Sequence, residues 1–193
     1  TGPSGLADQP RPFVFRASHL DGARFADGDT FDFTMNLFDL DEGLLTPIRL
    51  AFAMLEWTGL GPGRARVVLA SVTHELQTVS LAPDPKAAAL TALQLRFITP
   101  TEIKSKGEMV ERPDFGPLFA RIRDRVANIY ERQHSRPLKI DFRGMGERAQ
   151  LIRMTQCEVR TVEVDRRSSR TGQEHSIGGF IGEASYEGAL GEF

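Results

Sequence analysis

The feature that most restricts the fold is the order of apolar patterns between residues 93 and 188. Residues 93–97 alternate apolar and polar side chains, as a strand with one buried face does, and residues 115–130 repeat apolar side chains at helical spacing. Residues 151–164 and 177–188 again have the character of strands, on either side of a polar hairpin tip. The order strand, helix, strand, strand opens the βαββαβ arrangement of ferredoxin-like folds, without its last helix and strand.

The first part of the chain has the character of the closing half of a second such unit. Residues 13–15 form a short predicted strand, and residues 31–37 alternate strictly, which predicts a strand with one buried face. Thr46 and Pro47 are typical N-cap and first-turn residues of a helix. Residues 67–76 complete the unit as a further predicted strand.

The boundary between the two units is expected at Pro83 and Pro85, because two close prolines block both a helix and a central strand. A short strand is also expected at residues 138–142, where apolar residues alternate. The predicted fold class is α+β, with two ferredoxin-like (RRM-like) units, each with an antiparallel sheet and helices on one face. Residues 1–82 would close an N-terminal unit, and residues 83–193 would form a C-terminal unit without its last helix and strand. The presence of two incomplete units predicts that the chain is part of a longer protein.

Bulk composition predicts a soluble, cytoplasmic protein without a metal or cofactor. A chain of 193 residues that is 40% hydrophobic can bury a sizeable core. Its apolar runs are broken well before the roughly 18 residues that a membrane span needs. The single cysteine, Cys157, excludes an internal disulfide, and the four histidines, at positions 19, 74, 134 and 175, lack the spacing of zinc ligands.

Charge is distributed unevenly along the chain. Residues 1–60 carry four basic and nine acidic side chains, whereas residues 118–170 carry thirteen basic and seven acidic ones. Of the 24 basic residues 20 are arginine, whose planar guanidinium suits phosphates and base stacking. A nucleic-acid partner for the second segment is therefore possible, although a solvated arginine-rich surface explains the same pattern.

Three short motifs could bind phosphate. Thr99 and Thr101 end a predicted strand and are followed by Lys104 and Lys106, which either bind phosphate or form a capped turn. A basic hairpin tip contains Arg166, Arg167 and Arg170, and the polar face of the long helix contains Arg121 and Arg125. The glycine-rich segment 59–64 lacks the Lys-Ser/Thr of a nucleotide-binding loop, so it is interpreted as a helix stop and turn.

Several sequence segments together resemble one family. They are "RPFVF", "GDTFDFTMNLF", "GLGPGR", "LRFITPTEIKSKGE", "PDFGPLFARIRDRVANIY" and "GGFIGEASYEG". In this order they resemble the CRISPR-associated endoribonucleases that process repeat precursor RNA, within the repeat-associated mysterious protein (RAMP) superfamily. The resemblance spans most of residues 11–193.

The resemblance implies tandem ferredoxin-like domains that bind CRISPR repeat RNA in antiviral defence. It implies metal-independent cleavage without a cofactor, in which a ribose 2′-hydroxyl attacks the adjacent phosphate. The family's histidine lies in the first half of the N-terminal domain, which has no counterpart in the matching segments, so the catalytic residues stay unknown. The candidate RNA contacts are Lys104, Lys106, Arg121, Arg125, Arg166, Arg167 and Arg170.

Two alternatives stay open from the sequence. The chain could be a non-catalytic RNA-binding subunit, in contact with other subunits of a CRISPR effector complex. It could also be a small-molecule enzyme of ferredoxin-like form, which would have no affinity for RNA.

Overall fold

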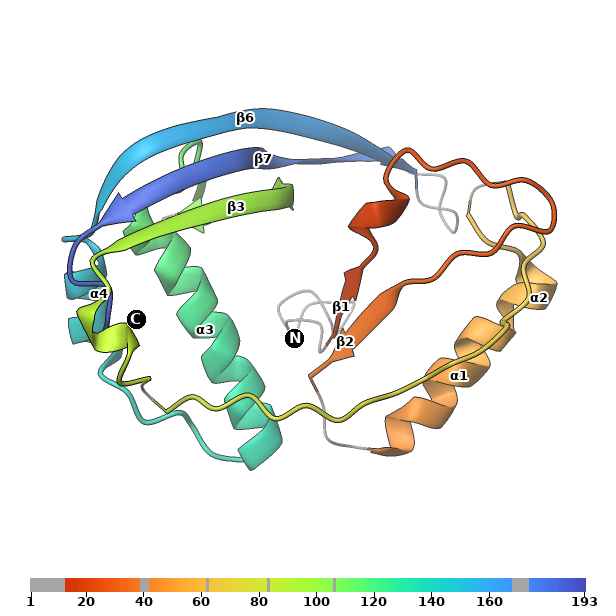
Figure 1. Cartoon of the computed structure of the whole chain (residues 1–193), viewed down its shortest axis with the longest axis horizontal. Helices are drawn as coiled ribbons and strands as arrows, with labels where there is room; N and C mark the ends of the chain where they lie inside the picture. Colours follow the sequence, from red (N-terminus) through yellow and green to blue (C-terminus); the bar gives the residue numbers. More distant parts are fainter. Residues whose placement is uncertain (1–12, 39–41, 62, 83, 106, 168–173) are drawn as a thin grey trace.

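The structure is a computed structural model of the chain (Figure 1). It describes residues 13–38, 42–61, 63–82, 84–105, 107–167 and 174–193. Lys106 and Arg170, two of the candidate RNA contacts, lie outside the described residues, as do Asp39, Asp41, Pro62 and Pro83.

The C-terminal unit contains a three-stranded antiparallel sheet. Its strands are β3 (Ala92–Thr101), β6 (Arg153–Arg167) and β7 (Glu174–Glu187), in the spatial order β3-β7-β6. The helix α3 (Phe115–His134) connects β3 to β6, so β3 and β6 lie on either side of β7. This is the strand order of the opening part of a ferredoxin-like unit, and the α+β prediction is confirmed.

The core of this unit lies between the sheet and α3. Alternation along the strands directs Ala184 and Tyr186 of β7 towards Phe115 and Leu118 of α3, and all four are buried. Aromatic rings fill the space between them; the rings of Phe115 and Tyr186 meet edge-on with centroids 5.4 Å apart. The helix begins after Asp114, as predicted.

The sequence predicted a strand at residues 138–142, but residues 138–141 form no strand and a second helix of the C-terminal unit, α4 (Phe142–Ala149), begins at residue 142. That prediction was wrong. The carboxylate of Asp141 accepts a hydrogen bond from the Gly144 amide at 2.9 Å and so caps the helix. The guanidinium of Arg123 on α3 lies 5.0 Å from the centre of the Phe142 ring. It also donates a hydrogen bond to the backbone carbonyl of Phe142, and the two contacts fix α4 against α3.

The strands β6 and β7 continue beyond the end of β3 as a two-stranded arm. We call residues 162–167 and 174–179 the arm; they pair in register from Val162–Gly179 to Arg167–Glu174. The last rung of the three-stranded sheet joins Thr101 to Phe180. Figure 1 shows the arm extending away from α3 towards the N-terminal unit.

The N-terminal unit contains a hairpin of β1 (Phe13–Arg16) and β2 (Thr34–Leu37), followed by the helices α1 (Leu45–Ala53) and α2 (Leu55–Thr58). The ring of Phe52 on α1 lies 5.4 Å from that of Phe33 and 6.4 Å from that of Phe15. The prediction of Thr46 as the N-cap was wrong, because the helix begins at Leu45 after Leu44 and Thr46 lies inside its first turn with Pro47. The second strand is shorter than the predicted 31–37.

Residues 67–76 form no strand, contrary to the prediction. Val67 and Leu69 are half-buried whereas Val68 is exposed, so the expected alternation is present at the start of the segment. A strand also requires a neighbour, and no described residue pairs with this segment. The amide of Leu69 instead donates to the Glu56 carboxylate at 3.2 Å.

Candidate nucleic-acid interface

The Thr-Pro-Thr end of β3 lies directly against a glycine of β7. A Cβ atom on Gly179 would be 2.7 Å from the backbone nitrogen of Thr101, so only glycine allows this approach. The hydroxyl of Thr101 donates to the Thr99 carbonyl at 3.0 Å, which is the turn-stabilising role considered from the sequence. The glycines of β7 thus shape the end of the sheet.

Lys104 follows on the short strand β4 (Lys104–Ser105), which pairs with β5 (Glu108–Met109). Its ammonium group lies 3.1 Å from the carboxylate of Glu102, and both side chains are exposed. An exposed ion pair is weak, so Lys104 can still exchange Glu102 for a phosphate.

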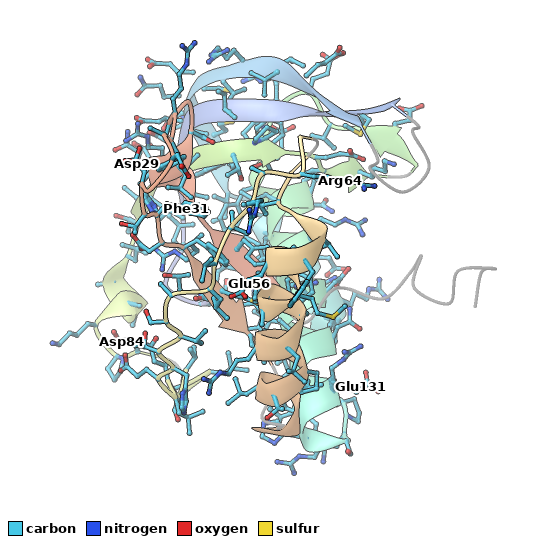
Figure 2. The ribbon with its side chains drawn as sticks, turned by 90° about the vertical axis from the view of Figure 1, so that its right-hand side faces the viewer. Asp29, Phe31, Glu56, Arg64, Asp84 and Glu131 are labelled. Carbon is cyan, nitrogen blue, oxygen red and sulfur yellow. The ribbon has the colours of Figure 1, made fainter. Side chains whose placement is uncertain are left out.

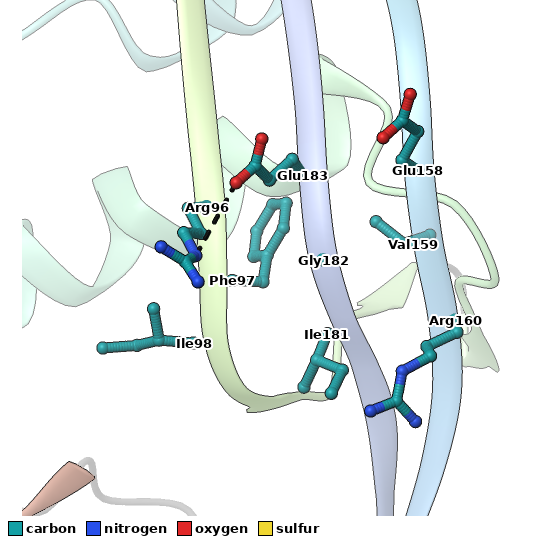
Figure 3. A pocket seen from close by; sticks show the side chains of 9 residues that line it. All are labelled: Arg96, Phe97, Ile98, Glu158, Val159, Arg160, Ile181, Gly182 and Glu183. Atoms are coloured by element: carbon teal, nitrogen blue, oxygen red, sulfur yellow. Dashed lines mark ion pairs between the residues drawn. The ribbon is translucent and has the colours of Figure 1, made fainter. Parts of the chain in front are cut away.

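The sheet face opposite α3 carries a shallow depression of about 400 Å³ across all three strands (Figure 3). Arg96 and Glu183 form an ion pair of 3.6 Å at its rim, and Glu158 and Arg160 lie on the neighbouring strand. Gln94 also donates to Glu183 at 2.9 Å. Positive and negative side chains therefore alternate on this face and largely neutralise one another, which disfavours it as a surface for the RNA backbone.

Arg166 and Arg167 lie at the far end of the arm, where β6 pairs with His175 and Glu174 of β7. Arg121 and Arg125 lie one helical turn apart in the first half of α3. Figure 1 shows α3 beneath the sheet and the arm end beyond it, near the N-terminal unit. The structure therefore places the candidate arginines in two separate groups.

Tyr186 connects the sheet to the segment before α3. Its hydroxyl is fully buried and donates to the carbonyl of Pro113 at 2.6 Å. Burial raises the pKa of Tyr186 to about 12, because an ionised phenolate would lose its hydration, and the nearby Cys157 and Asp114 add to this shift. The tyrosine of the "GGFIGEASYEG" segment thus has a structural role.

Replacing Tyr186 by phenylalanine is expected to lower the free energy of unfolding by about 1–3 kcal/mol, because the Pro113 carbonyl would stay buried without a donor. Urea denaturation at neutral pH measures the loss. An unfolded tyrosine ionises near pH 10, so the wild type should also lose stability between about pH 10 and 12, and Tyr186→Phe should lose less over that range. Equal stability of the two proteins at neutral pH, and an equal loss between about pH 10 and 12, would contradict this role.

Two of the four histidines make contacts that the structure describes. His19 is exposed, and its Nε2 lies 2.9 Å from the carbonyl oxygen of Asp32. His134 packs on the Tyr130 ring with centroids 4.3 Å apart. No group of three His, Cys, Asp or Glu side chains that could hold a metal ion occurs among the described residues.

Two arginines that sequence reasoning did not select, Arg64 and Arg66, lie at exposed positions of the N-terminal unit. Arg64 lies in the glycine-rich segment 59–64 after α2, which was interpreted as a helix stop and turn, and Arg66 follows that segment. The helix does stop at Gly59, which has a φ of 76°. Positive φ at Arg64 was the missing signal, and a single sequence does not reveal it.

Together these features define a ferredoxin-like α+β protein with a two-stranded arm, whose strand β6 ends in Arg166 and Arg167. The sequence profile described as "CRISPR-associated endoribonuclease Cas6" matches residues 95–193, and a second profile, AF_1859_N, described as "N-terminal domain", matches residues 3–90. The chain belongs to the Cas6 family of CRISPR-associated endoribonucleases. A comparison with curated proteins gives no match.

Two solved structures are similar to the chain. "Cas6 (TTHB231) product complex" is 21% identical, with a TM-score of 0.52, and the match covers 95% of this chain and 71% of that chain. "Cas6 (TTHA0078) product complex" is 20% identical over the same shares, with a TM-score of 0.42. The first likeness shows that the fold is shared. Within the described residues, no helix is both long and apolar enough to cross a membrane.

Proposed function

We propose that the chain binds precursor RNA transcribed from CRISPR repeats and cuts it once per repeat to release guide RNAs. The observation that carries the proposal is the family match over residues 95–193, the part of the chain that also holds the arm. The two arginines at the end of β6, Arg166 and Arg167, suit the phosphate backbone, since arginine binds phosphate oxygens with a planar pair of donors.

The proposed chemistry is attack by a ribose 2′-hydroxyl on the adjacent phosphate, which leaves a 2′,3′-cyclic phosphate and a free 5′-hydroxyl. It needs a base, an acid and positive charge near the phosphate, and it needs no metal ion. Arg166 and Arg167 would supply charge that holds the backbone in place. The base and the acid stay unassigned.

The test is incubation of the protein with labelled repeat RNA in the presence of EDTA. A single defined cut with a cyclic phosphate end is expected, and the matching DNA strand should stay intact. A 2′-deoxy substitution on the 5′ side of the cut position should abolish cleavage. A requirement for Mg²⁺, or cleavage of the deoxy-substituted RNA, would overturn the mechanism.

A second candidate is an RNA-binding subunit that does not cut. It is motivated by the unassigned base and acid; His19, for example, contacts only the backbone carbonyl and the carboxylate of Asp32 among the described residues. Binding of repeat RNA without any cut in the same assay would select this candidate.

We also propose that the chain divides into units at residue 83, as the sequence predicts. Support comes from the hydrogen bonds that connect the segment after the boundary to the C-terminal unit. The amides of Gly188 and Leu190 donate to the carbonyls of Thr91 and Leu90, each at 3.0 Å. The described strands of β1–β2 pair only with each other.

A further inference from the structure

The helical segment of the N-terminal unit has apolar side chains on two opposite faces. α1 and α2 follow one another along one line in Figure 1, and the amide of Met54 donates to the Leu50 carbonyl at 2.9 Å across their junction. On the inner face Phe52 packs against two phenylalanine rings at the β1–β2 hairpin, and Ile48 and Leu55 are half-buried. This face is therefore already packed within the unit.

Three large apolar side chains lie on the opposite face of the same helical segment. Leu50 and Met54 are each 61% exposed, and Trp57 is 89% exposed. Their spacing of four and three residues places them in one stripe along the helix. Each follows a residue of the inner face by two positions, which is a rotation of about 200° around the helix axis. We call these three side chains the outer stripe.

The two-layer fold of the unit does not explain the outer stripe. A ferredoxin-like unit has helices on one face of a sheet, so the far side of a helix is left to solvent. Figure 1 shows α1 and α2 at the outer edge of the molecule, and in Figure 2, viewed from that side, no helix or strand of the described residues lies in front of them. Three such side chains expose roughly 400 Å² of apolar surface, the size at which a patch marks an interaction site.

Two opposite charges lie beside the outer stripe on the same flank of the helix. Arg49 and Glu56 are seven residues apart, close to two full helical turns, so both side chains lie to one side of the stripe. Both are exposed, and Arg49 forms no ion pair with any other described residue. The amide of Leu69 donates to one oxygen of the Glu56 carboxylate at 3.2 Å, which leaves the other oxygen for a cation.

This arrangement of charge and apolar surface is self-complementary. When two identical helices pack antiparallel about a two-fold axis, each flank of one helix meets the same flank of the other. An axis near residue 53 would place Leu50 of one copy opposite Trp57 of the other. The same axis would place Arg49 of one copy opposite Glu56 of the other, and symmetry would repeat both contacts. A second copy of the chain therefore carries the spacing of charges that the flank requires.

We propose that the chain forms a homodimer through the outer stripe, with the α1–α2 segments of two copies packed antiparallel. The inference goes beyond the proposed function and does not depend on RNA binding. Two stripes would bury roughly 800 Å² in all, less than the about 1,200 Å² at which specific stable interfaces begin, so the dimer should be weak, with a Kd in the micromolar range.

Sedimentation equilibrium of the protein between about 1 and 200 μM measures the dimer. Trp57 is the only tryptophan of the chain, so its emission should move to shorter wavelength as the concentration passes the Kd. Trp57→Ser removes the largest apolar contact and should raise the Kd about tenfold or more. Leu151→Ser, at a residue of the C-terminal unit that is 79% exposed, is the matched control and should dimerise as the wild type does.

Charge reversal tests the antiparallel register. Arg49→Glu and Glu56→Arg each place like charges opposite one another across the axis, and each should raise the Kd about three- to tenfold. The double variant Arg49→Glu/Glu56→Arg restores opposite charges and should return the Kd to within about twofold of the wild type. Thermal melting of each variant checks the fold, because Glu56→Arg also removes the hydrogen bond from Leu69.

Four outcomes would overturn the inference. A monomer at every concentration, with unshifted tryptophan emission, would mean that the outer stripe does not pair with itself. A dimer that Trp57→Ser leaves unchanged would use another surface. Single reversals that the double reversal does not rescue would exclude the antiparallel arrangement. An emission shift that appears only on addition of phosphatidylcholine vesicles would assign the outer stripe to a lipid surface.

Discussion

Replacing Gly182 by alanine is expected to destabilise the C-terminal unit strongly. Gly182 has a φ of 129°, which side chains rarely adopt, and an added Cβ would lie 2.1 Å from the carbonyl oxygen of Glu158 and 2.9 Å from the Cα of Val159. All of these atoms belong to backbone in the middle of the sheet, so the clash cannot be relieved by turning a side chain. Strain and overpacking together should cost about 3–5 kcal/mol, a large share of a typical domain stability.

Gly178→Ala is the matched control for this substitution. Gly178 lies four residues away on the same strand, and an added Cβ would meet no atom within 4 Å. Its free energy of unfolding should change by less than about 0.5 kcal/mol. Circular dichroism during urea denaturation measures both variants. A Gly182→Ala protein as stable as Gly178→Ala would mean that β7 does not approach β6 this closely.

The sequence predicted the C-terminal unit well because its periodic patterns and its tertiary contacts agree. Alternation at Leu93 and Leu95 and the helical spacing from Phe115 to Leu118 describe surfaces that pack on one another in the structure. Register and the close approach at Gly182 could not be predicted, because they depend on contacts between residues far apart in the chain.

The two wrong strand predictions have different causes. Residues 67–76 have the pattern of a strand, but pattern alone does not supply a hydrogen-bonding neighbour. In residues 138–142 three alternating apolar side chains were too short a pattern to separate a strand from a helix start. The Asp141 cap, which the structure reveals, was the stronger local signal.

For the candidate site, sequence reasoning found the residue types and not their arrangement. It selected Arg121 and Arg125 with Arg166 and Arg167, since all four are basic residues in an arginine-rich segment. Their arrangement depends on the length of the β6–β7 pairing. This pairing continues past the end of β3, and Arg166 and Arg167 lie in the part beyond β3. Substitution of the arginines in each group separately is therefore needed to test which group binds RNA.

Reversing both charges at the arm end, with Arg166→Glu and Arg167→Glu, is expected to weaken binding of repeat RNA about 100-fold at moderate salt. Two lost phosphate contacts and two added repulsive charges act on the same ligand segment. The free energy of unfolding should change by at most about 1 kcal/mol, because the described core of the unit lies within the three-stranded sheet and the main cost is a like charge placed opposite Glu174. Binding titrations between 50 and 200 mM salt measure the change, and thermal melting checks the fold.

The matched control is the double reversal Arg136→Glu and Lys139→Glu, at two exposed positions between α3 and α4. It changes the net charge of the chain by the same amount, at a place that Figure 1 shows far from the arm. If RNA is held by the arm, this control should lose less than about threefold in affinity, since screening limits exposed charges to about 10 Å. Equal losses in the two double variants would mean that RNA responds to net charge alone, and the arm would then have no special part in binding.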